Sequence, residues 1–184
     1  MEKLKKLLAG RKATYVEKTP EDVYREVAEG LDQFSPEDIA KIGGLESEHG
    51  KFDKPKQGGS ARGLFQFQPP TAEELEPGSA ESISDMNTQA SLMAKYLEKN
   101  NAQSPEEAFS YHNLGTTGGK RFFSADDDAL VSTVIPERVI RANPSLYGVK
   151  TVGEAKALIK KRLQSGEDSI ELAPTIMDLF KEKK

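Results

Sequence analysis

The sequence lacks both cysteine and tryptophan, and it contains only two histidines among its 184 residues. Without cysteine, the chain can form neither a disulfide bond nor a metal site with thiolate ligands. No apolar run approaches the length of a membrane-spanning helix. These absences exclude several classes of protein, but they do not indicate the class to which the chain belongs.

The charge balance is close to neutral, with 26 basic and 30 acidic residues and a net charge of -4. The chain is therefore no polycation, and we do not expect nucleic acid as a partner. Basic residues gather at both ends of the chain, at Lys3, Lys5, Lys6, Arg11 and Lys12 and again at Lys181, Lys183 and Lys184. We interpret them as solvated tails, and weak adhesion to an anionic cell wall or membrane surface is the alternative.

Helix-start signals recur along the chain. Thr19-Pro20, Ser35-Pro36 and Ser104-Pro105 are each followed by two acidic residues. A hydroxyl can cap the first amides, proline suits the first helical position, and acids favour the positive end of the helix dipole. The segments that begin at Thr71 and Thr151 are typical of capping boxes.

Apolar residues come after these starts at helical spacing, as in Val23, Val27 and Leu31, in Met86, Ala90, Met93, Ala94 and Leu97, and in Ala155, Leu158, Ile159 and Leu163. Period-two alternation is almost absent, although residues 64–67 could form a short extended piece. We predict a mainly α protein with five to eight helices and little or no β structure. Residues 1–34 are predicted to be a leader with one helix, 35–148 the main domain, and 151–184 a C-terminal helical extension.

One glutamate has a position that suits acid chemistry. Glu46 lies four residues after Ile42, at the edge of the apolar face of the helix predicted from Ser35. A partly desolvated carboxyl favours its protonated form, which is what a general acid needs near neutral pH. A surface glutamate at a helix end is the commoner situation, so the interpretation depends on the motifs downstream of Glu46. Gly43-Gly44, just before it, indicates either a close approach by another backbone or a helix break.

Downstream of Glu46-Ser47 lie the segment Gly63-Leu64-Phe65-Gln66-Phe67-Gln68-Pro69-Pro70-Thr71, then Asp85-Met86-Asn87 with Ala90 and Tyr96-Leu97, then Tyr111-His112-Asn113-Leu114-Gly115. In order and spacing this set resembles the catalytic domain of lytic transglycosylases, the goose-type-lysozyme-like enzymes that cut peptidoglycan. The resemblance covers residues 46–115, and it implies a lysozyme-like helical fold.

The resemblance also implies roles for individual residues. Glu46 would be the acid/base, and Gln66 would hydrogen-bond the substrate, although an amide that satisfies local backbone is a serious rival for Gln66. Ser47 would support the helix end, or it would act only as a cap. Phe67 could line the groove, but core packing is expected for at least one of Phe65 and Phe67.

The chain departs from the family pattern in two places. When the patterns are aligned on Gly115, the family tyrosine falls on His112 and the family asparagine on Asn113, whereas Tyr111 lies one position early. Either Tyr111 or His112 is therefore expected to face the substrate. The family serine in the loop before Gly63 has no clear counterpart, and Ser60 is the nearest one. Because tryptophan is absent, stacking on sugars would depend on tyrosine and phenylalanine.

In this family a single glutamate works with the N-acetyl group of the substrate, and the product carries a 1,6-anhydromuramyl end. We therefore expect a lyase that acts on peptidoglycan strands and needs no cofactor or metal. A hydrolytic muramidase of the same fold and a non-catalytic wall-binding virion component are the alternatives. A metal-dependent peptidase using His49 and Asp53 is the least favoured, because neither histidine has a recognised ligand spacing.

The place of action is implied by the same resemblance. The apolar stretch Leu7-Leu8-Ala9 near the start is too short for the central region of a signal peptide. We expect the protein to reach the cell wall, in the periplasm, by other means. It could be carried in a bacteriophage virion with other virion proteins, or delivered by a secretion machine or a holin-like pore, or it could be an excised piece of a longer protein.

Overall fold

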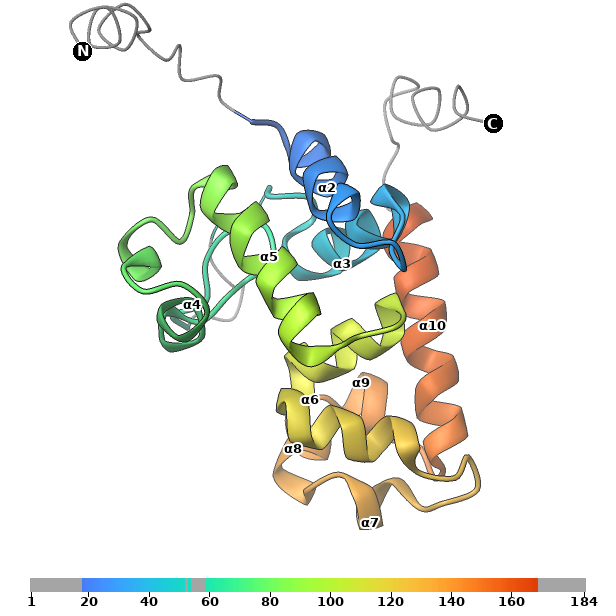
Figure 1. Ribbon diagram of the computed structural model, residues 1–184. Coiled ribbons are helices and arrows are strands. Elements are labelled where there is room, and N and C mark those ends of the chain that lie inside the picture. Colours follow the sequence, from blue (N-terminus) through green and yellow to red (C-terminus); the bar gives the residue numbers. More distant parts are fainter. Residues whose placement is uncertain (1–17, 52, 54–58, 169–184) are drawn as a thin grey trace, which may run out of the picture.

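The computed structural model describes residues 18–51, 53 and 59–168, and Figure 1 shows their arrangement. The predicted basic tails lie outside the described residues, as does part of the loop after Lys51. The described residues form nine α-helices: α2 (Pro20–Glu29), α3 (Pro36–Ser47), α4 (Pro69–Leu75), α5 (Met86–Asn100), α6 (Pro105–Ser124), α7 (Val131–Val134), α8 (Glu137–Ala142), α9 (Pro144–Tyr147) and α10 (Val152–Asp168), with a single 3-10 turn at Ser79–Glu81.

The prediction of a mainly α fold is confirmed. No β-sheet occurs in the described ranges, which contain only two isolated bridges, between Arg62 and Phe67 and between Leu130 and Thr151. The nine α-helices of the described residues exceed the predicted five to eight, and three of them are the short helices α7, α8 and α9.

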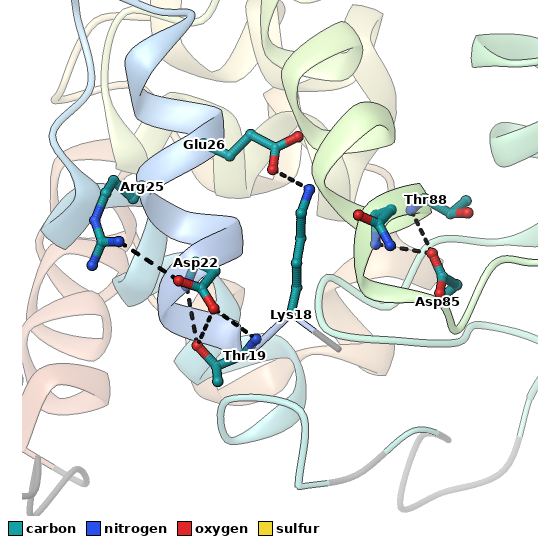
Figure 2. A network of polar contacts seen from close by, with 8 residues as sticks. Lys18, Thr19, Asp22, Arg25, Glu26, Asp85 and Thr88 are labelled. Atoms are coloured by element: carbon teal, nitrogen blue, oxygen red, sulfur yellow. Dashed lines mark hydrogen bonds and ion pairs between the residues drawn. The ribbon is translucent and has the colours of Figure 1, made fainter. Parts of the chain in front are cut away.

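Most of the predicted helix starts are confirmed. Thr19 and Asp22 form a capping box, in which the Asp22 carboxylate accepts hydrogen bonds from the Thr19 backbone N–H at 3.0 Å and hydroxyl at 2.9 Å (Figure 2). Ser35 and Ser104 cap α3 and α6 with their hydroxyls, and Glu154 accepts from the Thr151 N–H at 3.0 Å. The prediction at Thr71 was wrong, because α4 already begins at Pro69 and has no side-chain cap.

The helices share one core, and this core includes parts of both predicted extensions. Helix α2 packs on α3 and α5 and buries Val23 and Val27 completely. Helix α10 lies alongside α3 and also contacts α6 (Figure 1), and it buries Ile159 and Leu163. The described residues on either side of 35–148 therefore contribute to the packing of that segment.

Gly43, the first residue of the glycine pair in α3, has an explanation that differs from both sequence-based alternatives. The helix continues through Gly43 and Gly44 without a break. A Cβ atom on Gly43 would lie 2.7 Å from the phenolic oxygen of Tyr24, so a side chain from α2, rather than a backbone, occupies that space. Tyr24 in turn shares a hydrogen bond of 2.7 Å with Nδ1 of His49, just beyond the end of α3.

Candidate active site

A cleft of about 1080 Å³ opens at the C-terminal end of α3. The walls come from that helix end, the turn that comes after Ala61, helices α4, α5 and α6, and one residue of α10. Six of the eight residues predicted for the site line this cleft: Glu46, Ser47, Gln66, Tyr111, His112 and Asn113.

Glu46 is the penultimate residue of α3 and is one of the residues that line the cleft. The residue as a whole is partly buried, but its Oε1 atom has no accessible surface and no hydrogen-bond partner among the described residues. Burial raises the pKa of Glu46, and the smaller opposing effects come from the charges of His112 and Arg162. A buried carboxyl of this kind keeps its proton to higher pH than an exposed glutamate does.

Ser47 holds the helix end in place. Its hydroxyl donates to the carbonyl of Leu64 at 2.7 Å and accepts from the N–H of Gly50, also at 2.7 Å. Glu48 and His49 between them have φ values of 49° and 59°, a left-handed conformation that is uncommon outside glycine. Ser47 therefore links the C-terminal end of α3 to the turn that contains Leu64.

That turn is held from the other side by Gln89 of α5. The Gln89 Oε1 atom accepts from the N–H of Phe65 at 2.8 Å, and its amide nitrogen donates to the carbonyl of Ile83. Gly63 has a φ of 77°, and a Cβ atom there would lie 2.3 Å from the Gln89 amide nitrogen. Only glycine fits this position. Gln89 was not identified as a structural residue from the sequence. The feature that could have identified it is its position as a polar residue within the apolar stripe of the predicted helix.

Gln66 has a structural contact as well as a place in the cleft. Its amide nitrogen donates to the carbonyl of Gly63 at 2.7 Å and to that of Asp53 at 3.2 Å. The residue itself has a φ of 50° and is almost completely buried. The local contacts considered for Gln66 from the sequence are therefore present, and they fix its side chain at the cleft wall.

Two predicted site residues do not line the cleft. Phe67 has no accessible surface and packs in the core, with ring centroids 6.4 Å from Phe65, 5.7 Å from Tyr96 and 5.5 Å from His112. Ser60 is exposed and its hydroxyl donates to the side chain of Gln68. Phe67 thus supports the cleft from behind by packing against two of its lining residues.

Tyr111 and His112 both line the cleft, but their surroundings differ. The Tyr111 hydroxyl donates to the carboxylate of Glu107 at 3.2 Å, and burial raises its pKa. Of the two residues, His112 is the one whose charge lowers the pKa of Glu46. The His112 ring packs edge-on against Tyr96, with the two ring centroids 5.8 Å apart. His112 therefore lies near the acid, together with Tyr96, whose pKa is raised by burial and by the charge of Glu46.

Helix α6 changes direction just after these residues. Gly115 has a φ of 70° and a ψ of 158°, a backbone conformation that is essentially restricted to glycine. Beyond the kink, the hydroxyl of Thr116 donates to the side-chain oxygen of Asn100 at 2.5 Å, and both residues line the cleft. The motif at 111–115 thus ends one helical segment at the cleft wall.

Arg162 completes the cleft from α10, and it was not identified from the sequence. Its Nη1 atom donates to the hydroxyl of Ser145 at 3.2 Å. The residue lies in the predicted C-terminal extension, and no linear pattern indicates that this helix returns to the end of α3.

The other acidic side chains at the cleft wall have surroundings that differ from those of Glu46. The acids Glu48 and Glu74 at the cleft wall are exposed, and they pair with Lys51 at 3.8 Å and Lys99 at 2.5 Å. No group of three or more side chains suited to a metal ion occurs among the residues that the structure describes.

Comparison with known proteins does not assign the chain to a family. No family model matches it, and no curated protein matches it. Within the described ranges, no helix is long and apolar enough to span a membrane.

Proposed function

We propose that the protein is a peptidoglycan lytic transglycosylase that acts on the bacterial cell wall. The observation that carries the proposal is the carboxyl of Glu46, which is buried at the wall of a large polar cleft and has a raised pKa. A protonated acid beside a cleft that can hold several sugar rings is what cleavage of a glycosidic bond requires.

In the first step, Glu46 would donate its proton to the oxygen that bridges N-acetylmuramic acid and N-acetylglucosamine. As that bond breaks, the carbonyl oxygen of the N-acetyl group on the muramic acid forms a bond to the anomeric carbon. The positive charge then lies on the resulting oxazolinium ring, and Glu46 is left as a carboxylate beside it.

In the second step, the Glu46 carboxylate would take the proton of the 6-hydroxyl of the same sugar. That oxygen attacks the anomeric carbon, the oxazolinium ring opens, and a 1,6-anhydro ring forms. Glu46 regains its proton, so the cycle closes without consuming water and without a cofactor.

The distribution of acids favours this single-carboxyl route over the two-carboxyl route of many glycosidases. The other lining carboxylates, Glu48 and Glu74, are exposed and paired with lysines, so their environment differs from that of Glu46. The side-chain amides of Gln66, Asn100 and Asn113 line the same cleft as Glu46, and amides suit hydrogen bonding to sugar hydroxyls and N-acetyl groups.

The test is digestion of purified peptidoglycan, with the products analysed by mass spectrometry. The wild-type protein should release fragments with 1,6-anhydromuramyl ends, and Glu46→Gln should reduce the rate by at least about 100-fold, the contribution typical of a general acid. Glu37→Gln, an exposed carboxyl in the first turn of the same helix, is the matched control and should keep the wild-type rate.

The outcomes separate the alternatives. Release of only hydrated reducing ends would make the protein a muramidase rather than a lyase. Binding to the wall without any cleavage, unchanged in Glu46→Gln, would instead identify a non-catalytic wall-binding component.

A further inference from the structure

Tyr96 of α5 lines the cleft, and its ring belongs to a closed cluster of three aromatic rings. The ring centroids of Tyr96 and Phe67 are 5.7 Å apart, and those of Tyr96 and His112 are 5.8 Å apart. The rings of Phe67 and His112 also contact each other, at 5.5 Å. All three pairs are edge-on, a geometry that is favourable beyond the area it buries. The cluster therefore holds the Tyr96 ring in one orientation at the cleft wall.

The backbone at Tyr96 is fixed as well. Asn100, one turn further along α5, donates from its side-chain amide to the carbonyl of Tyr96 at 2.8 Å. The side-chain oxygen of Asn100 accepts from the hydroxyl of Thr116 in α6 at 2.5 Å. Tyr96 thus lies next to a link between α5 and the helix that carries His112.

The hydroxyl of Tyr96 has an unusual environment. Buried tyrosines usually find a hydrogen-bond partner for this group, as Tyr24 and Tyr111 do. No hydrogen bond joins the Tyr96 hydroxyl to another residue in the part of the chain that the structure describes. The Tyr147 hydroxyl also lacks a partner among these residues, but it is closed off from solvent, whereas the Tyr96 hydroxyl is not. The Tyr96 hydroxyl can therefore bond a molecule that enters the cleft.

Burial decides which kind of contact Tyr96 can make. Only 7% of its surface is exposed, which leaves too little of the ring for a sugar to stack on its face. The hydroxyl offers one donor and can also accept. Burial raises the pKa of Tyr96, so the hydroxyl keeps its proton and remains a donor at neutral pH. The contact that suits this residue is a single hydrogen bond to an uncharged group.

We infer that Tyr96 is a substrate-binding residue whose hydroxyl hydrogen-bonds an uncharged oxygen of the glycan, and that the ring cluster around it holds this hydroxyl in place. The inference rests on the proposed function, because it takes a glycan as the ligand of the cleft. The oxygen could belong to an acetamido group or to a hydroxyl of the sugar. The shared chemistry is a neutral oxygen that forms one hydrogen bond with a phenol.

The test measures binding, by calorimetric titration with chitotetraose. This neutral glycan contains no muramic acid, so the proposed lyase does not cut it during the measurement. Tyr96→Phe removes the hydroxyl alone and should weaken binding about fivefold, the effect of one hydrogen bond between uncharged groups. The Tm of the variant should stay at the wild-type value, because the lost hydroxyl has no partner among the described residues.

A second ligand identifies the oxygen that is bound. In N-thioacetyl chitotetraose, sulfur replaces the acetamido oxygen and is a weaker hydrogen-bond acceptor. If Tyr96 binds the acetamido oxygen, the thioacetyl ligand should lose affinity for the wild type but not for Tyr96→Phe. If Tyr96 binds a sugar hydroxyl, the losses from the two changes should add.

Tyr147→Phe is the matched control. It also removes a phenolic hydroxyl without a partner among the described residues, but from a position outside the cleft lining. This variant should bind chitotetraose like the wild type. An equal loss of affinity in the two variants would overturn the inference, because the loss would then not depend on the cleft.

Other outcomes would overturn it too. These are an affinity of Tyr96→Phe within about twofold of the wild type, or a wild-type protein that does not bind chitotetraose. A variant that binds normally but cuts peptidoglycan with a lower kcat and a shifted pH profile would make Tyr96 a positioning residue for Glu46 instead. The proposed function fails separately: a wild-type protein that binds the glycan through Tyr96 but never cuts peptidoglycan would leave the contact in place.

Discussion

The packing of Tyr24 on Gly43 predicts the effect of adding a single methyl group to α3. In Gly43→Ala, the new Cβ would lie 2.7 Å from the Tyr24 oxygen, 2.8 Å from Cε1 and 3.1 Å from Cζ. These distances are shorter than normal van der Waals contacts. Only 3% of the Tyr24 surface is exposed, so this side chain has little room to move.

Two effects oppose each other in this variant. Replacing glycine by alanine inside a helix stabilises it by about 1 kcal/mol. Overpacking a core site costs about 1–3 kcal/mol, and displacing Tyr24 from His49 would lose a hydrogen bond worth about 1 kcal/mol. We expect the packing effect to dominate, so that the free energy of unfolding falls by about 1–3 kcal/mol.

The assay is urea unfolding of a double-mutant cycle. Tyr24→Leu removes the three atoms nearest to Gly43, so in that background Gly43→Ala should become stabilising by about 1 kcal/mol through helix propensity alone. If Gly43→Ala stabilises the protein even when Tyr24 is present, the contact does not explain the glycine and the reasoning is wrong.

Two other substitutions test the cleft walls. Because burial raises the pKa of Glu46, ionisation of this carboxyl is less favourable in the folded protein than in the unfolded chain, and the wild type should lose stability as pH rises through the folded-state pKa. Glu46→Gln should remove this loss, so its Tm should be higher than that of the wild type on the alkaline side. Thermal melts recorded across pH measure the difference. Gln89→Leu should leave the Phe65 N–H and the Ile83 carbonyl without their partner, and each loss should lower the free energy of unfolding by about 1–3 kcal/mol. The exposed control Gln164→Leu should change the free energy of unfolding by less than about 0.5 kcal/mol.

Local features of the sequence predicted most of the helices correctly. The caps at Thr19, Ser35 and Ser104 depend on residues within one turn, and their hydrogen bonds are present as expected. The position of Glu46 at the edge of a buried helical face also agrees with local spacing, because Ile42 lies one turn before it and is buried.

The features that were not predicted depend on contacts between distant parts of the chain. Gln89 acts on a turn 24 residues earlier, and Tyr24 fills the space left by Gly43. Arg162 reaches the cleft only because α10 packs on α3, which places it in the site from outside the segment that carries the motifs. Core packing was expected for at least one of Phe65 and Phe67, and both rings are buried, so the possible place of Phe67 in the groove is not confirmed.

The most direct test of the central claim is a titration of the Glu46 carboxyl by NMR, using glutamate labelled with ¹³C at the side-chain carboxyl and Glu46→Gln to assign its signal. The structure predicts that this signal keeps the chemical shift of a protonated acid to a higher pH than the signal of an exposed glutamate does. A Glu46 signal that titrates together with the exposed glutamates, or below them, would contradict a buried proton donor at the cleft.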